Sequence, residues 1–307
     1  MKALIIGLGS IGLMYDINYS RKNYCRTHSK SLFQIEFFKD VSVVDLSSYK
    51  LKIAKKEYGF STYRKLSEGL KKTKPNFVVI SSDTKNHLKN FNEIIKYYIP
   101  KIILIEKPIS NNIDDIKKIF KICKIKKIKL FTNFIRRSEK SVINIKKNFL
   151  KGSYQGTVYY NKGFLNNGSH WINVLEYFFG KVQKFKILRT KKKKLDKEID
   201  VELFFKKNKI NLIHEKSTKI ANYMNIQSKF NQINYLNGGK KIFIYDKKTN
   251  NKKIVDNSMR MYQLNVIKEI VKVFKNRTYY NLCDQQEALS NFKTVFDIYL
   301  KLNDKKK

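Results

Sequence analysis

Residues 2–12, KALIIGLGSIG, decide the fold of this chain. The run KALIIG is rich in Ile and Leu, which is typical of a buried strand, and it leads directly into the GxGxxG pattern at 7–12. After a strand, Gly7 permits a tight turn, Gly9 lets the backbone approach a pyrophosphate, and Gly12 allows close packing of the following helix. The N-terminus of that helix would offer N–H groups to phosphate oxygens. The stretch therefore predicts a dinucleotide-binding turn, and an ordinary tight turn is the alternative.

Similar apolar runs recur through the first half of the chain, with amphipathic stretches between them. The runs are VSVVDL (41–46), NFVVIS (76–81), KIILIE (101–106) and KIKLFTNF (127–134). The amphipathic stretches are 48–58, 63–73, 86–98 and 112–124. Strands that alternate with helices predict parallel βαβ units in a doubly wound sheet. We therefore expect a Rossmann dinucleotide-binding domain over residues 1–132.

Beyond residue 134 the pattern changes to strands in succession. They are expected at 154–161, 182–190, 199–206, 209–215, 222–231 and 241–246, with helices at about 168–179, 260–276 and 284–302. Runs of strands beside a few helices indicate an antiparallel or mixed sheet that is covered on one face. The fold class is then α/β, with an N-terminal doubly wound parallel sheet. Residues 133–307 form a C-terminal α+β domain with a largely antiparallel open sheet, which we expect to bind substrate and to build oligomers.

The composition restricts the class of protein. The chain has 307 residues, of which 42% are hydrophobic, and this is enough for two domains with a sizeable core. Three scattered cysteines, none in a CxxC pair, give no sign of a disulfide framework or a redox motif, and we expect no metal site. No apolar run approaches the roughly 18 residues that a membrane helix needs. A reduced, soluble, cytoplasmic protein without membrane insertion is the expectation.

The net charge of +40 raises the question of nucleic-acid binding. The lysines, however, run along the whole chain instead of gathering on one segment. The abundance of Asn, Ile, Tyr and Phe beside them is typical of an A/T-rich genome, which explains the lysines without a ligand. No helix-turn-helix, zinc-finger or RNA-binding pattern accompanies the charge. We expect no specific nucleic-acid partner.

Asp45 ends the second predicted strand, where a carboxylate accepts hydrogen bonds from the adenine-ribose hydroxyls and repels a 2′-phosphate. This position favours NAD over NADP, and an ordinary turn aspartate is the alternative. The separation from Gly12 exceeds the usual ~20 residues because of a polar stretch at 15–30, which we interpret as an inserted loop near the cofactor. Nearby Lys50 keeps the use of NADP open.

Six motifs, taken in order, resemble the glucose–fructose oxidoreductase / inositol dehydrogenase (Gfo/Idh/MocA) family. They are GLGSIG (7–12), Asp45, SSDTKNH (81–87), EKPIS (106–110), NFIRR (133–137) and NNGSHWIN (166–173). The resemblance rests on motifs to about residue 185 and on architecture alone from there to the end. It implies cofactor contacts from Gly7, Gly9, Ser10, Ile11, Gly12, Asp45, Ser82, His87, Glu106 and Lys107.

The EKP motif is the most specific of the six. Glu106, Lys107 and Pro108 end a predicted parallel strand, at the edge where open α/β sheets bind ligands. By resemblance, Lys107 is a catalytic lysine aimed at the substrate and nicotinamide, where an ammonium stabilises a developing alkoxide. A surface lysine is the alternative. In SSDTKNH, Asp83 replaces the family's proline, and His87 is more typical of a structural residue at a helix start than of a catalyst.

The segment 166–173 carries the second residue that we expect to be catalytic. The family commonly shows Asp-x-Gly-x-His-x-x-Asp here, and the matching residues are Asn166, Gly168, His170 and Asn173. A histidine can accept the substrate hydroxyl proton as the hydride leaves. The two amides cannot do so, but they can orient a sugar through hydrogen bonds. A helix-packing histidine is the alternative.

Asn133 and Arg136 or Arg137 follow the fifth predicted strand, where the family has Asn-x-Arg. By resemblance they contact the sugar or an acidic substituent, which suits a bidentate guanidinium. Plain surface positions are the alternative.

Together these residues predict an NAD(P)-dependent oxidoreductase that moves a hydride between nicotinamide and a ring carbinol or ketone of a sugar or nucleotide sugar. The resemblance associates the NNGSH variant with bacterial surface-polysaccharide and unusual-sugar pathways. A dinucleotide-binding sensor or assembly protein with weakened catalysis is the alternative, because both family carboxylates are missing. The resemblance also implies a homodimer or homotetramer built on the sheet of the second half.

Overall fold

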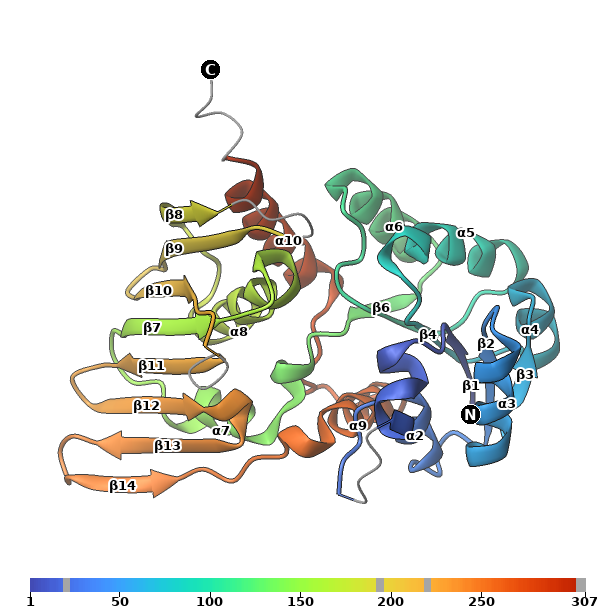
Figure 1. Cartoon of the computed structure of the whole chain (residues 1–307), viewed down its shortest axis with the longest axis horizontal. Coiled ribbons are helices and arrows are strands. Elements are labelled where there is room, and N and C mark those ends of the chain that lie inside the picture. Colours follow the sequence, from blue (N-terminus) through green and yellow to red (C-terminus); the bar gives the residue numbers. More distant parts are fainter. Residues whose placement is uncertain (19–22, 192–195, 218–221, 302–307) are drawn as a thin grey trace. The chain divides into compact units, whose positions relative to one another are not determined.

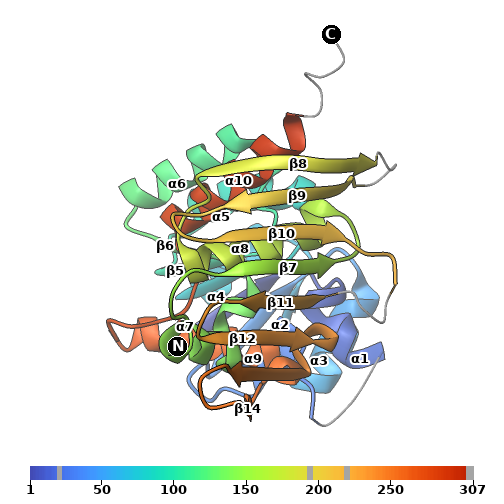
Figure 2. The ribbon, with the colours of Figure 1, turned by 90° about the vertical axis from the view of Figure 1, so that its left-hand side faces the viewer.

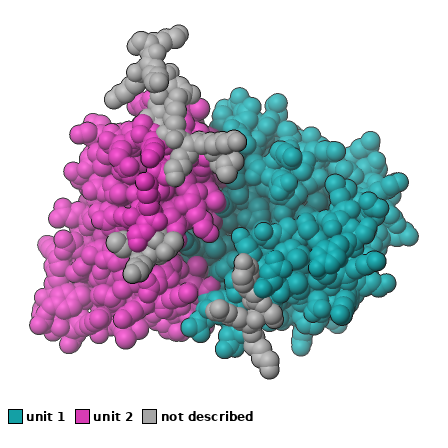
Figure 3. Space-filling model, viewed as in Figure 1, with its two compact units in different colours: residues 1–138, 260–289 teal, residues 139–259, 290–307 magenta. Residues whose placement is uncertain are grey.

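The computed structural model describes residues 1–18, 23–191, 196–217 and 222–301. The chain forms two compact units, which Figure 3 distinguishes by colour. Unit 1 consists of residues 1–138 and 260–289, and unit 2 consists of residues 139–259 and 290–307. The predicted division between residues 132 and 133 lies close to the point where the chain first passes from unit 1 to unit 2. Residues 260–289 then return to unit 1.

Unit 1 is built on a six-stranded parallel sheet with the order β3-β2-β1-β4-β5-β6 (Figure 1). The strands are β1 (Lys2–Ile6), β2 (Asp40–Val44), β3 (Ser61–Tyr63), β4 (Phe77–Ile80), β5 (Ile102–Ile105) and β6 (Lys129–Thr132). Every residue of β4 and β5 is buried, as expected of strands covered on both faces. The predicted doubly wound parallel sheet is confirmed.

Helices cover both faces of this sheet, as Figure 1 shows. They are α1 (Tyr15–Asn18), α2 (His28–Phe33), α3 (Ser48–Tyr58), α4 (Leu66–Thr73), α5 (His87–Tyr97), α6 (Ile113–Ile125) and α9 (Tyr262–Phe274). Leu32 of α2, Ala54 of α3 and Ile270 of α9 share one buried cluster with Ile5 of β1, so these three helices cover one face. Helices α4, α5 and α6 pack in series on the other face.

Unit 2 contains an eight-stranded sheet with the order β14-β13-β12-β11-β7-β10-β9-β8. The strands are β7 (Gln155–Tyr160), β8 (Lys184–Lys191), β9 (Glu198–Phe204), β10 (Lys209–His214), β11 (Tyr223–Gln227), β12 (Asn231–Leu236), β13 (Lys241–Asp246) and β14 (Asn251–Ile254). Neighbouring strands are antiparallel except β7 and β10. The predicted largely antiparallel second sheet is confirmed.

One face of the second sheet carries the helices of unit 2, which are α7 (Lys140–Asn148), α8 (Ser169–Phe179) and most of α10 (Gln285–Leu300). Figure 2 shows this sheet from its other face, with these helices behind it. Trp171 of α8 is fully buried against the sheet. Asn291 and Thr294 of α10 donate hydrogen bonds to the carboxylate of Glu176, at 3.1 and 3.2 Å, and so fasten α10 to α8.

We expect the α9 helix to be needed for the stability of unit 1. Ile270 is fully buried, so Ile270→Ala should lower the free energy of unfolding by about 2–5 kcal/mol through lost burial and a cavity. Ile125→Ala is the control, because Ile125 is 66% exposed and its loss should change stability by no more than about 0.5 kcal/mol. Urea unfolding followed by circular dichroism measures both. Equal stability of the two variants would contradict the prediction.

Candidate active site

The glycine loop at the end of β1 has the geometry that close packing and ligand approach require. Gly7 has a φ of +95°, and a Cβ there would lie 2.6 Å from the backbone nitrogen of Ser82. A Cβ on Gly12 would collide with the carbonyl oxygen of Gly7. Gly9 is different, because a Cβ at this position would meet no described atom within 4 Å. The fold therefore excludes side chains at Gly7 and Gly12, whereas the space above Gly9 is open to a ligand.

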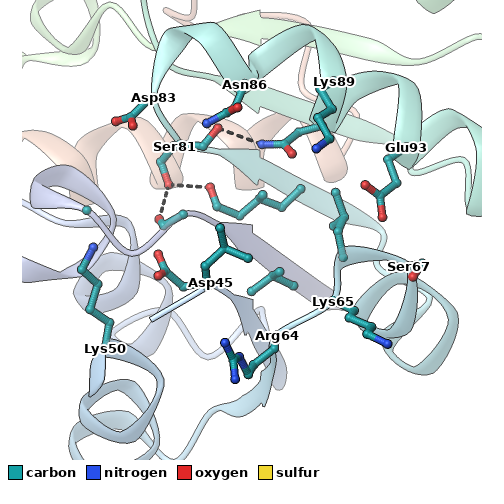
Figure 4. A pocket seen from close by; sticks show the side chains of 18 residues that line it. Asp45, Lys50, Arg64, Lys65, Ser67, Ser81, Asp83, Asn86, Lys89 and Glu93 are labelled. Atoms are coloured by element: carbon teal, nitrogen blue, oxygen red, sulfur yellow. Dashed lines mark hydrogen bonds between the residues drawn. The ribbon is translucent and has the colours of Figure 1, made fainter. Parts of the chain in front are cut away.

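A cavity of about 530 Å³ adjoins the glycine loop at the carboxyl edge of the parallel sheet (Figure 4). Gly7 and Gly9 line it beside Asp45, and Ser82 belongs to its wall on the side of β4. The remaining lining residues are Ile6, Val44, Leu46, Lys50, Arg64, Lys65, Leu66, Ser67, Ser81, Asp83, Asn86, Lys89, Asn90 and Glu93. A glycine loop, an acidic strand end and hydroxyl groups in one cavity fit an adenine dinucleotide, whose phosphates and ribose need such groups.

Asp45 lines this cavity, and both its carboxylate oxygens accept backbone hydrogen bonds. The N–H of Leu8 donates to Oδ2 at 2.6 Å, and the N–H of Ser47 donates to Oδ1 at 2.8 Å. The carboxylate therefore ties the glycine loop to the turn that starts α3. Each oxygen keeps a second lone pair, so Asp45 can also accept from a ribose hydroxyl.

Glu106 belongs to a buried hydrogen-bonded group of four residues, which we call the Glu106 tetrad: His28, Glu106, Asn133 and Gln263. Nε2 of His28 lies 3.0 Å from Oε1 of Glu106, and Nε2 of Gln263 lies 2.8 Å from Nδ1 of the same ring. The amide nitrogen of Asn133 donates to Oε1 of Glu106 at 2.5 Å and to Oε1 of Gln263 at 3.1 Å. All four residues are buried.

The tetrad keeps Glu106 ionised in spite of its burial. Burial alone raises the pKa of this carboxyl, but the hydrogen bond and charge of His28, the hydrogen bond from Asn133 and the charge of Lys107 outweigh it. The pKa of Glu106 consequently lies below the ordinary 4.5. A buried anion is therefore held one residue before Lys107, the expected catalytic lysine.

His87 is nearly fully buried beside the turn formed by Glu106, Lys107 and Pro108, which we call the EKP turn. Its Nδ1 lies 3.1 Å from the carbonyl oxygens of both Pro108 and Ile109, and its Nε2 lies 2.8 Å from the carbonyl oxygen of Ser82. The peptide between Lys107 and Pro108 is cis. His87 thus links the loop after β4 to the loop after β5 through backbone oxygens.

The residues after β6 are buried in unit 1. Asn133 is 1% exposed, and its amide nitrogen donates hydrogen bonds to Glu106 and Gln263 within the Glu106 tetrad. Arg137 pairs with Glu287, with Nη2 2.7 Å from Oε1, and Arg136 is also buried. A contact between sugar and Asn133 or Arg136 stays a prediction.

The segment with His170 starts α8 in unit 2. Asp196 accepts the backbone N–H groups of Leu165 at 3.2 Å and Asn166 at 2.9 Å, and so fixes the turn before α8. The side chain of Asn166 is exposed, His170 is half-buried one turn later, and Asn173 is buried. Lys107 belongs to unit 1, so the pairing of Lys107 with His170 stays a prediction.

Sequence reasoning missed His28, Gln263 and Asp196. His28 lies at the end of the 15–30 stretch that we interpreted as a loop, and Thr27 caps the α2 helix that begins there. Gln263 follows the whole of unit 2 in sequence, and no pattern in the chain connects it to the EKP motif. A histidine directly after a capping threonine is a weak signal of structure and no signal of a buried hydrogen bond to a distant carboxylate.

Two further observations concern metal ions and membranes. Among the described residues, no three His, Cys, Asp or Glu side chains converge in a way that could hold a metal ion. Within the same ranges, no helix combines the length and the apolarity that passage through a membrane requires.

Comparison with known proteins identifies the first part of the chain. Residues 1–134 match the model of the GFO_IDH_MocA oxidoreductase family, described as an NAD-binding Rossmann fold. Residues 1–134 are therefore similar to the Rossmann domain of that family. The predicted resemblance is thereby confirmed, and with it an NAD-binding oxidoreductase family. No curated protein matches the chain.

Solved structures share the folds of unit 1 and unit 2. UDP-N-acetylglucosamine 3-dehydrogenase GnnA from Acidithiobacillus ferrooxidans superposes with a TM-score of 0.80 and 13% identity, over 98% of this chain and 97% of that one. The WlbA dehydrogenase from Bordetella pertussis, in complex with NADH and UDP-GlcNAcA, superposes with a TM-score of 0.74 and 14% identity, over 99% of this chain and 97% of that one. An oxidoreductase from Agrobacterium radiobacter, in complex with NAD+, L-tartaric acid and magnesium, superposes with a TM-score of 0.73 and 13% identity, over 97% of this chain and 95% of that one. At these identities the likeness shows the fold.

The lowered pKa of Glu106 predicts a specific pH dependence of stability. The carboxylate stabilises the folded state above the unfolded-state pKa of about 4.5, and this contribution is lost as the pH falls through the lower folded-state pKa. Glu106→Gln should therefore be less stable than the wild type near neutral pH, and the difference should shrink on acidification. Urea unfolding at several pH values measures it, with exposed Glu57→Gln as the control. A constant difference across the range would contradict the assigned pKa shift.

Proposed function

We propose that the chain is an NAD(P)-dependent oxidoreductase that transfers a hydride between nicotinamide and a ring carbinol or ketone of a sugar or nucleotide sugar. The observation that carries this proposal is the arrangement at the carboxyl edge of the parallel sheet. The glycine loop follows β1, Asp45 follows β2, and the EKP turn follows β5. Parallel strands end at the same edge, which is where open α/β sheets bind dinucleotides.

The roles of the side chains follow from their chemistry. When bound, the nicotinamide ring accepts or donates the hydride. The ammonium Nζ of Lys107 would stabilise negative charge on the substrate oxygen, and the Glu106 tetrad and His87 hold the backbone that carries it. The imidazole of His170 would take the proton of the substrate hydroxyl during oxidation and return it during reduction.

The substrate class in this proposal rests on the solved structures with this fold. Two of them are named for nucleotide sugars, as a UDP-N-acetylglucosamine dehydrogenase and as a complex with UDP-GlcNAcA. Asn166 and Asn173 can donate and accept hydrogen bonds from sugar hydroxyls, and Arg136 can pair with an acidic substituent. A place in bacterial surface-polysaccharide or unusual-sugar biosynthesis, in the cytoplasm, is part of the same proposal.

A second candidate function is a dinucleotide-binding sensor or assembly protein with weakened catalysis. The amides at Asn166 and Asn173, where the family commonly has carboxylates, favour it. The two candidates differ in turnover and agree in cofactor binding, so both measurements are needed to separate them.

Substitution of the proposed catalytic pair tests the enzyme. Lys107→Ala and His170→Asn should each lower turnover of a responsive nucleotide sugar by about 10²–10⁴-fold, because each removes a group that acts on the transferred proton or its charge. NADH binding should persist in both variants, and the exposed Lys101→Ala should keep full activity.

The screen for turnover uses UDP-sugars and free sugars, and the formation or loss of NADH is followed by absorbance. Near-wild-type turnover in both variants would refute the pair, and NADH binding without any turnover would favour the sensor.

We also propose a homodimer or homotetramer that uses the uncovered face of the second sheet. Val158 and Tyr160 of β7 are buried toward the helices, so the alternating Thr157 and Tyr159 lie on the uncovered face and are only partly exposed. Light scattering should give two or four times the chain mass of 36.5 kDa. The mass of one chain at every concentration would contradict this.

A further inference from the structure

A second cavity, of about 480 Å³, belongs to unit 2 alone and has no role in the mechanism above. It lies at the end of the second sheet where turns join β9 to β10, β11 to β12 and β13 to β14 (Figure 1). Its volume falls within the range of about 300–1,000 Å³ that is typical of small-molecule sites. Four lysines line it, so we call it the lysine cavity: Lys207, Lys209, Lys229 and Lys247.

The wall of the lysine cavity carries positive charge without a matching negative charge. No acidic side chain is among the described residues that line it. Lys209 pairs with Glu202, which is not part of the wall, with Nζ 2.8 Å from Oε1. Lys207, Lys229 and Lys247 form no ion pair with any carboxylate in the described part of the chain. Ammonium groups gathered around one cavity repel one another, and an anion between them would relieve this repulsion.

Strand pairing brings the four lysines together from separate parts of the sequence. Lys207 lies in the turn between β9 and β10, and Lys209 starts β10. Lys229 lies in the turn between β11 and β12, and Lys247 directly follows β13. Strand β7 lies between β10 and β11, parallel to the first and antiparallel to the second, so β10 starts at the end of the sheet where β11 finishes. The convergence therefore results from the register of the sheet and not from a run of lysines.

Hydrogen bonds fix the backbone that carries these side chains. The N–H of Lys209 donates to the carbonyl oxygen of Tyr154 at 3.0 Å, and the N–H of Lys247 donates to that of Phe230 at 2.9 Å. The ammonium of Lys247 also donates to Oε1 of Gln227, at 3.1 Å. A frame that is fixed before a ligand arrives reduces the conformational entropy that is lost on binding.

We propose that the lysine cavity is an anion site for a small ligand that carries two linked phosphate groups. A diphosphate brings several negative charges to one place and can pair with lysines from different turns, whereas one carboxylate has a single charge to share among them. Lysine suits phosphate because its ammonium acts as a compact point charge with three donors. Free pyrophosphate and a nucleoside diphosphate both present this group. The site is independent of the proposed oxidoreductase function.

Isothermal titration calorimetry of the full chain at physiological salt tests the site, with pyrophosphate and ADP as ligands. A parallel titration contains excess NADH, which occupies the cavity beside the glycine loop, where phosphate groups could also bind. The variants are Lys207→Ala and Lys229→Ala, since neither side chain forms a hydrogen bond or ion pair within the described ranges. The control is Lys241→Ala, which removes an exposed lysine that starts β13, at the opposite end of the same sheet.

We expect one diphosphate to bind per chain while NADH is present in excess. Lys207→Ala and Lys229→Ala should each weaken this binding by about three- to tenfold, because each removes one charged partner, and Lys241→Ala should change it by less than about twofold. Without ligand, thermal unfolding should show an unchanged or higher Tm for both cavity variants, because the repulsion falls. Equal affinities for pyrophosphate and ADP would indicate a free diphosphate as the ligand, and tighter binding of ADP would indicate a nucleotide.

The contrary outcomes separate this site from the glycine loop and from the net charge of +40. Absence of saturable binding, or equal weakening by all three substitutions, would overturn the proposal, because the attraction would then come from the overall charge. Diphosphate binding that NADH abolishes and the lysine substitutions leave unchanged would overturn it too, while the proposed function would stand. Lysine-dependent binding of pyrophosphate by a chain that does not bind NADH would support the site and contradict the proposed function.

Discussion

The buried carboxylate of Glu106 is the constraint on which the rest of unit 1 depends. An ionised group out of water is costly unless it is paired and hydrogen-bonded, and here the partners come from distant parts of the chain. His28 starts α2, Asn133 follows β6, and Gln263 lies in α9. The tetrad is satisfied only when these segments are assembled around the end of β5. This requirement, together with the apolar contacts of Ile270, explains why the chain returns to unit 1 after unit 2.

The same arrangement determines how firmly the expected catalytic lysine is held. Lys107 has the tetrad on its N-terminal side, through Glu106, and His87 on its C-terminal side, through the carbonyl oxygens of Pro108 and Ile109. His87 also bonds the carbonyl oxygen of Ser82, so it connects the loops after β4 and β5. A flexible side chain on a backbone fixed from both sides loses less freedom when it meets a substrate, which favours precise charge stabilisation.

The sequence predicts a strand correctly where the strand is buried and therefore forms a continuous apolar run. The prediction fails where a strand is exposed and has no such run. KALIIG and KIILIE revealed β1 and β5, whereas β3 was missed because STY is short and none of its three residues is fully buried. The edge strand β14, NKKI, is exposed throughout and gave no signal, and α7 was hidden among polar residues. In the candidate site, the motifs located Asp45 and the EKP turn. They could not reveal His28 and Gln263, because side chains that meet only in the folded state leave no local pattern.

Asp45 shows why a strand-end residue alone is a weak guide to cofactor choice. Its carboxylate has a structural task, since it bonds the glycine loop and the α3 turn, and so it would be required whichever dinucleotide is bound. We expect the choice between NAD and NADP to depend on more than Asp45, because residues that follow the neighbouring strand β3 line the same cavity. In a parallel sheet that position is fixed by register, so exchange of the residue after β3 would alter the charge beside Asp45 without disturbing the sheet.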